Sequence, residues 1–79
     1  MTRREKLLAG IRNNPKNVRF QDACTAAGLI GFVRAGGRGS HVVYVRSGES
    51  MILTFQNRGG YIPPYQARQL IVMMDKYEG

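Results

Sequence analysis

The sole histidine of the chain stands where a glycine-rich, arginine-bearing loop enters a predicted strand. His41 follows the glycine-rich segment 36–40 and begins a strand-like run of alternating residues. Histidine gives and takes a proton near neutral pH without unusual tuning, and a polyanion held nearby would meet its imidazole. The cations within a few residues are Arg34, Arg38 and Arg46. The competing interpretation is a half-buried strand histidine that packs beside Val43 and Val45, and position alone leaves both open.

Phosphate contacts are predicted from arginines in and beside the glycine-rich loops. Arg38 and Arg58 lie in segments 36–40 and 56–60, where backbone amides can also approach an anion. Tyr44 is the aromatic candidate for stacking on a base, with a core position as the alternative. The predicted phosphate-binding residues are Arg34, Arg38, Gly39, Ser40, Arg46 and Arg58.

Other catalytic chemistries lack the residues they need. The five carboxylates are scattered singly, without the spacing of a two-metal nuclease, and one cysteine with one histidine makes no zinc site. Cys24 lies on a predicted apolar helix face, which favours a small buried hydrophobe over a catalytic thiol. Ser40 precedes His41, but adjacent strand residues point to opposite faces, which disfavours a Ser–His nucleophile pair. We therefore expect neither a metal nor a cofactor.

The composition favours a small protein that binds a polyanion. The 79 residues predict one domain, 1–79, too short for a large cofactor fold. The net charge of +7, with nine arginines among the twelve basic residues, favours nucleic acid as the partner, and an acidic protein is the alternative. The lone cysteine fits a reducing cytosol, and no apolar run approaches the ~20 residues that span a bilayer. With no apolar signal-peptide core at its start, the chain is expected to be cytoplasmic, without a membrane partner.

The residue pattern predicts two helices, three strands and a last helix. Thr2–Glu5 has the form of a capping box, and the first helix then runs to Asn13–Pro15. A second helix is predicted from Phe20 to a C-cap at Gly28. The strands are predicted at 32–35, 41–46 and 51–55, and their short connections require antiparallel pairing. The last helix starts at Pro64, and its predicted buried stripe is Ala67, Leu70, Ile71, Met74 and Tyr77.

This order predicts an α+β fold, a three-stranded antiparallel sheet with the first and last helices covering one face. Double-stranded-RNA-binding domains share the order helix–β–β–β–helix, which is a fold-level analogy. Their usual basic cluster at the start of the last helix is absent here, where the chain reads Pro64–Arg68.

Two segments together resemble one family. Gly39–Ser40–His41 followed by Val42–Val45 resembles the Gly-Ser-His strand of HicA-type (YcfA-like) toxins, which are bacterial mRNA interferases. Gly59–Gly60 and then Pro64–Leu70, which reads Pro-Tyr-Gln-Ala-Arg-Gln-Leu, are similar to the loop and last helix of a longer HicA subgroup. Helix order and length also agree, so the resemblance covers nearly the whole chain.

The resemblance implies a fold like a double-stranded-RNA-binding domain with one catalytic histidine, which maps to His41 with Gly39 and Ser40 beside it. Such proteins cleave RNA and are neutralised by a HicB antitoxin that covers the active site, and the antitoxin supplies the DNA contacts when the pair represses its operon. One departure is Tyr61–Ile62, where subgroup relatives often carry lysine, so that Arg58 is the only cation of that loop.

The resulting prediction is the toxin of a type II toxin–antitoxin system, a metal-independent endoribonuclease that cleaves mRNA through His41. Its partners would be mRNA and a HicB-type antitoxin, with DNA contacted only through the complex. The alternative is a non-catalytic RNA-binding or protein-interaction module with a basic surface.

Overall fold

Two of the three α-helices, α1 and α3, begin where the sequence supplies suitable first residues. In the computed structural model, which describes residues 2–78, α1 spans Arg3–Asn13, α2 Phe20–Leu29 and α3 Pro64–Tyr77, and a short 3₁₀ turn, η1, spans Pro15–Asn17. The predicted capping box of α1 is confirmed, because the Thr2 hydroxyl accepts a hydrogen bond from the Glu5 amide at 3.1 Å. Pro64 opens α3, at the position where a missing N–H costs nothing.

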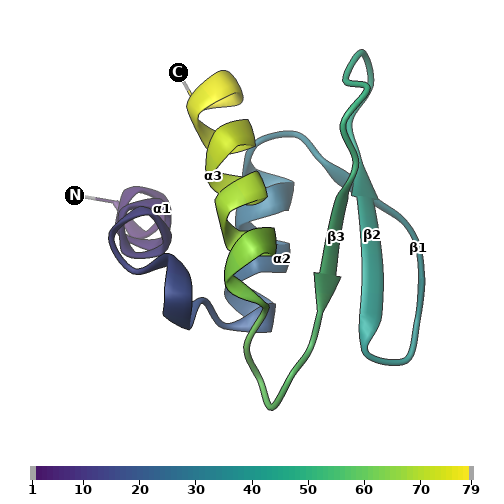
Figure 1. Cartoon of the computed structure of the whole chain (residues 1–79). Coiled ribbons are helices and arrows are strands. Elements are labelled where there is room, and N and C mark those ends of the chain that lie inside the picture. The colour runs from purple at the N-terminus through teal and green to yellow at the C-terminus, as the bar shows by residue number, and fades with distance from the viewer. Residues whose placement is uncertain (1, 79) are drawn as a thin grey trace.

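The strands form one antiparallel sheet, so the predicted α+β architecture is confirmed. β1 spans Val33–Arg38, β2 His41–Val45 and β3 Leu53–Gln56, in the order β1-β2-β3. Helices α2 and α3 pack against β3, whereas α1 packs on these two helices away from the sheet (Figure 1). The prediction that the first and last helices cover the sheet is therefore wrong for the first. The face of α2 that is buried consists of alanines, whose small side chains allow close packing.

Two predicted boundaries are wrong because glycines act differently from what their local pattern indicates. α2 continues past Gly28 to Leu29, and the left-handed conformation falls at Gly31, with φ +91°. Segment 36–38 belongs to β1, so the turn between β1 and β2 shrinks to Gly39–Ser40.

The turn after β2 is tied to the end of α3 by one carboxylate. Glu49 accepts hydrogen bonds from the Lys76 ammonium at 2.7 Å, from the Tyr77 hydroxyl and from the backbone amide of Met51 at 2.8 Å. These donors lower the pKa of Glu49 from 4.5 to about 2.

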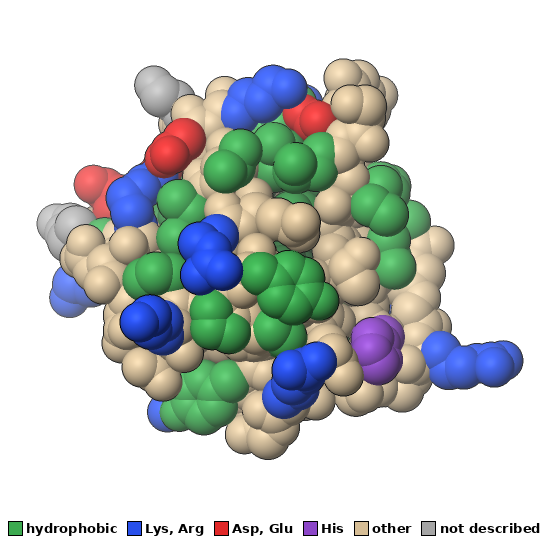
Figure 2. All heavy atoms as spheres, in the orientation of Figure 1, with side chains coloured by type: hydrophobic (Ala, Val, Ile, Leu, Met, Phe, Trp, Pro, Cys, Tyr) green, Lys and Arg blue, Asp and Glu red, His purple; other side chains and the backbone are tan. Residues whose placement is uncertain are grey.

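Charge is divided unevenly between the two ends of the molecule. On the face drawn in Figure 2, acidic side chains (red) lie toward the end that carries the chain termini in Figure 1. The opposite end, where β1 turns into β2, shows only basic charged side chains (blue) on this face, together with the histidine (purple). On this face, the histidine end therefore presents cations without a carboxylate beside them.

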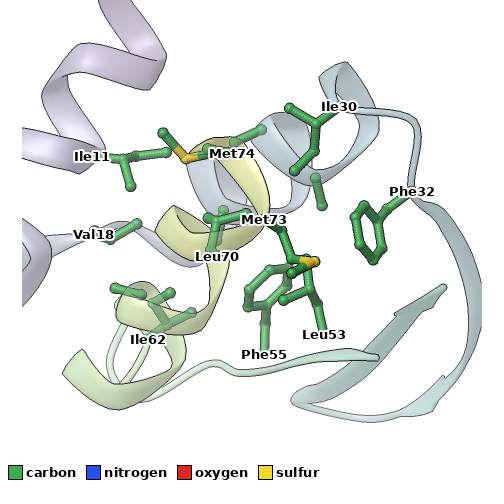
Figure 3. Packing of buried hydrophobic residues seen from close by; sticks show 14 of the residues in the cluster. Ile11, Val18, Ile30, Phe32, Leu53, Phe55, Ile62, Leu70, Met73 and Met74 are labelled. Atoms are coloured by element: carbon green, nitrogen blue, oxygen red, sulfur yellow. The ribbon is translucent and has the colours of Figure 1, made fainter. Parts of the chain in front are cut away.

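The core lies between the helices and β3 (Figure 3). Phe55 and Leu53 of β3 are fully buried, and they meet Leu70 and Met73 of α3. β1 lies outside this core, since all six of its residues are exposed. No helix of the described residues is long and apolar enough to cross a membrane.

Candidate active site

His41 is the first residue of β2 and has a strand partner on each side. It is exposed, and it lies opposite Arg38 of β1 and Gln56 of β3. Directly opposed residues of antiparallel strands project to the same face of the sheet, so the three side chains are neighbours. The next residue, Val42, is buried on the other face, beside Phe55. The half-buried alternative for His41 is therefore wrong, and its imidazole faces solvent.

The spacing of the strands brings Gln56 especially close to His41. The Asn57 amide donates to the Ser40 carbonyl at 2.8 Å, which makes His41 and Gln56 a pair of the type without mutual backbone hydrogen bonds. Such pairs have Cα atoms only about 4.5 Å apart. No hydrogen bond joins the His41 imidazole to another residue of the range 2–78, so both ring nitrogens are free to meet a substrate.

Glycines fix the backbone beside the histidine. Gly39 has φ +61° at the first position of the two-residue turn, where type II′ hairpins place glycine. Gly37 has φ +139°, and a Cβ there would stand 2.5 Å from the His41 carbonyl oxygen. Gly37 therefore allows β1 to approach the start of β2 more closely than a residue with a side chain would.

Arg58 comes to the same end of the sheet through the loop that follows β3. The hydrogen bond between Asn57 and Ser40 sets this loop beside the β1–β2 turn. Arg58 follows Gln56 by two residues, a backbone span of at most about 7 Å. The Asn57 side chain also accepts the Gly60 amide at 2.7 Å and so orders the loop.

The structure therefore brings together five of the predicted site residues and separates two. Arg34 pairs with Tyr44, whose ring lies 5.8 Å from that of Phe55, so Arg34 projects to the core side of the sheet. Arg46 follows the far end of β2, about 16 Å along the strand from His41. The five that share one end are Arg38, Gly39, Ser40, His41 and Arg58.

Arg46 makes two contacts inside the protein. Its Nε donates to the Ile30 carbonyl at 3.0 Å, and its guanidinium lies 3.7 Å from the centroid of the Tyr77 ring. This cation–π contact occupies one face of the guanidinium, and the bond to Ile30 uses one of the in-plane N–H donors by which an arginine binds phosphate. By contrast, neither the Arg38 nor the Arg58 guanidinium forms an ion pair or a cation–π contact within residues 2–78, so both remain available to an anion.

The sequence prediction missed two residues that lie at the His41 end of the sheet. Gln66 in the first turn of α3 is only 3% exposed, and its Oε1 accepts the Gln56 amide at 2.8 Å. The adjacent Tyr65 is 52% exposed, and its hydroxyl accepts a hydrogen bond from the side-chain Nε2 of Gln66 at 3.3 Å. The sequence did contain a signal that Gln66 is buried, because it lies four residues before Leu70 and therefore on the same buried stripe of the helix. A buried polar side chain needs a hydrogen-bond partner.

The remaining candidates lie outside this site. Cys24 is half-buried, and burial raises the pKa of its thiol, with the Tyr44 hydroxyl and Arg34 opposing the rise. A protonated thiol is a poor nucleophile, as expected of a packing residue. Tyr44 is half-buried against Phe55, so the core alternative for its ring is confirmed. In the described part of the chain, no group of three His, Cys, Asp or Glu side chains could hold a metal ion.

The site thus combines one solvent-facing imidazole, a guanidinium opposite it and a second guanidinium on the neighbouring loop. This set can bind a phosphodiester and move one proton beside it. In comparisons with known proteins, no family model, no curated protein and no solved structure matches this chain.

Proposed function

We propose that this protein is a metal-independent endoribonuclease that cleaves mRNA and serves as the toxin of a type II toxin–antitoxin system. The observation that carries the proposal is the exposed His41 in a cross-strand pair with Arg38, at the basic end of the molecule. RNA is the substrate that fits, because its 2′-hydroxyl supplies a nucleophile and the site needs only a base and cations.

In this mechanism His41 accepts the proton of the ribose 2′-hydroxyl while the 2′-oxygen attacks the adjacent phosphorus. The bond from phosphorus to the 5′-oxygen breaks, and a water donates the proton that this leaving oxygen requires. Arg38 and Arg58 stabilise the negative charge that develops on the phosphorane. The products are a 2′,3′-cyclic phosphate and a 5′-hydroxyl.

The fold supports the finer part of the proposal, a relation to HicA-type toxins and to double-stranded-RNA-binding domains. The segment from α2 to α3 has the order helix–β–β–β–helix, with both helices against β3. In this proposal α1 is an addition before that unit, and the protein acts in the cytoplasm. The exposed strand β1, which ends beside the histidine, favours a HicB-type antitoxin that covers the site, with DNA contacted only through the complex.

The test is the incubation of RNA with wild-type protein and with His41→Ala, in the presence of EDTA. Loss of a general base is expected to slow cleavage by about 10²- to 10⁴-fold. Melting should change little, because the exposed imidazole contributes little packing. Single-stranded DNA should remain intact, since it lacks the 2′-hydroxyl.

Each contrary result has a definite meaning. Products with 5′-phosphates, or cleavage abolished by EDTA, would contradict the role of His41. Binding without cleavage by the wild type would favour the alternative, a non-catalytic RNA-binding module. Expression that leaves growth unaffected would contradict the toxin assignment.

A further inference from the structure

A second basic feature lies on the loop between β3 and α3. Gly59–Gly60, with φ +62° and +96°, fold this loop into a two-residue hairpin closed by Arg58 and Tyr61. The Arg58 amide donates to the Tyr61 carbonyl at 2.8 Å, and the Tyr61 amide donates back at 3.2 Å. Both glycines have the positive φ that a type I′ hairpin requires, so this turn is rigidly defined.

The other edge of this hairpin is also paired. Tyr61 forms an antiparallel bridge with Arg19, which precedes α2. The Phe20 amide donates to the Gly60 carbonyl at 2.9 Å, and the Ile62 amide donates to the Val18 carbonyl at 3.0 Å. Residues that are directly opposed across such bridges project to the same face. One face therefore carries the side chains of Arg58, Tyr61 and Arg19 in that order, which we call the Arg–Tyr–Arg ladder.

We infer that the Arg–Tyr–Arg ladder is a binding subsite for single-stranded RNA, in which Tyr61 stacks on a base and the two arginines hold the flanking phosphates. The inference rests on the proposed function and extends it to a part of the substrate away from the bond that is cleaved. Tyr61 is 41% exposed, and Arg58 and Arg19 are exposed and form no ion pair within residues 2–78.

The geometry of the ladder matches the chemistry of a single strand. An exposed aromatic ring offers a stacking surface to any base, and cations on both sides track the backbone. Because the loop backbone is held by four hydrogen bonds of these two bridges, the ring is positioned before RNA arrives and less ordering is needed on binding.

The ladder is also continuous with the catalytic end of the sheet. Arg58 belongs to both, since the preceding Asn57 bonds to Ser40, the neighbour of His41. Beyond Arg19, a cleft of about 230 Å³ continues between α1 and the start of α2. This cleft is lined by Lys6 and two asparagine amides, and also by the Asp22 carboxylate. Lys6 can meet a further phosphate and the amides can meet the edge of a base, whereas Asp22 repels a phosphate at its own end of the cleft. A strand bound at His41 thus has a defined path away from the site.

The experiment measures binding of a fluorescein-labelled 12-nucleotide single-stranded RNA by anisotropy, with every variant built in the non-cleaving His41→Ala protein. Tyr61→Ala is expected to weaken affinity by roughly 5- to 100-fold, the range found for loss of one base–aromatic stack. Tyr61→Phe keeps the ring and should stay within about twofold of its parent by the same principle. Melting curves check that both variants fold.

Charge is tested with a matched pair of variants. Arg19→Ala should reduce the slope of log affinity against log salt by about 0.7, as expected for one lost phosphate contact on a single strand. Lys16→Ala, which removes an exposed cation of η1 outside the ladder, should leave the slope unchanged. Equal slopes for the two variants would overturn the inference.

The outcomes also separate the subsite from the proposed function. RNA cleavage that depends on His41, with affinity unaltered by Tyr61→Ala, would overturn the subsite and leave the ribonuclease. Tyr61-dependent binding of RNA and of single-stranded DNA, without any RNA cleavage by the wild type, would support the subsite and overturn the ribonuclease. Failure to bind either strand would overturn the subsite.

Discussion

Replacement of Gly37 by alanine should push β1 away from β2, the strand that carries His41. A Cβ at this position would stand 2.5 Å from the His41 carbonyl oxygen and 2.8 Å from the Val42 Cα. Both atoms belong to the backbone of β2, so no side-chain rotation can relieve the contact. The φ of +139° is in addition a conformation that alanine rarely adopts.

The unfavourable backbone conformation alone sets a minimum for the loss of stability caused by Gly37→Ala. A residue held in such a region costs of order 1–3 kcal/mol, and each kcal/mol lowers the melting temperature of a domain this size by about 4–8 °C. A cost of about 2 kcal/mol therefore predicts a fall of roughly 8–16 °C. The steric contact adds to this cost, up to the point at which β1 swings away from β2. β1 can move in this way because it is an exposed strand at the edge of the sheet.

The neighbouring Gly36 provides the control. A Cβ there meets nothing within 4 Å, and its φ is not positive. Gly36→Ala should therefore shift melting by only a few degrees, as surface substitutions of about ±0.5 kcal/mol do. We expect Gly37→Ala to lower the melting temperature, to speed hydrogen exchange of the β2 amides that bond to β1, and to abolish RNA cleavage. Equal melting and equal cleavage for the two variants would refute the argument.

Three other predictions concern the charged and buried polar groups. Arg58→Ala should reduce the slope of log RNA affinity against log salt by about 0.7, whereas an unchanged slope would remove Arg58 from the phosphate contacts. Because the pKa of Glu49 is lowered to about 2 in the folded protein, its stabilising contribution is present above its ordinary pKa near 4.5 and is lost as the pH falls toward 2. Melting measured from pH 5 to pH 2 should therefore fall more steeply for the wild type than for Glu49→Gln, and parallel curves would contradict this. Gln66→Ala leaves the Gln56 amide without its acceptor, which costs about 1–3 kcal/mol in denaturant unfolding, whereas truncation of the exposed Gln69 costs about 0.5 kcal/mol or less. Equal losses for the two glutamines would contradict the buried role of Gln66.

Local signals allowed much of the architecture to be predicted from the sequence. The Thr2–Glu5 capping box and the start of α3 at Pro64 depend on residues a few positions apart, so the sequence predicts them without knowledge of the fold. The alternation around Val42 predicts β2 for the same reason, and short connections make the sheet antiparallel. The proximity of His41, Ser40, Gly39 and Arg38 also follows from a tight hairpin.

Only the tertiary structure decided which distant residues join the histidine. Arg46 is close to His41 in sequence, yet a strand carries it about 16 Å away, to the ring of Tyr77. Arg19 and Tyr61 are far apart in sequence, yet a backbone bridge makes them neighbours. Sequence separation gives no measure of such contacts, because they depend on how the elements pack.

The glycines also show which features the sequence predicts and which depend on the tertiary structure. The sequence alone indicates that segment 36–40 and the end of α2 need residues with unusual backbone freedom. It does not tell which glycine uses that freedom, because the positive φ of Gly31 and the close approach at Gly37 depend on partners elsewhere in the chain. Gly37 belongs to a strand only because β2 lies against it.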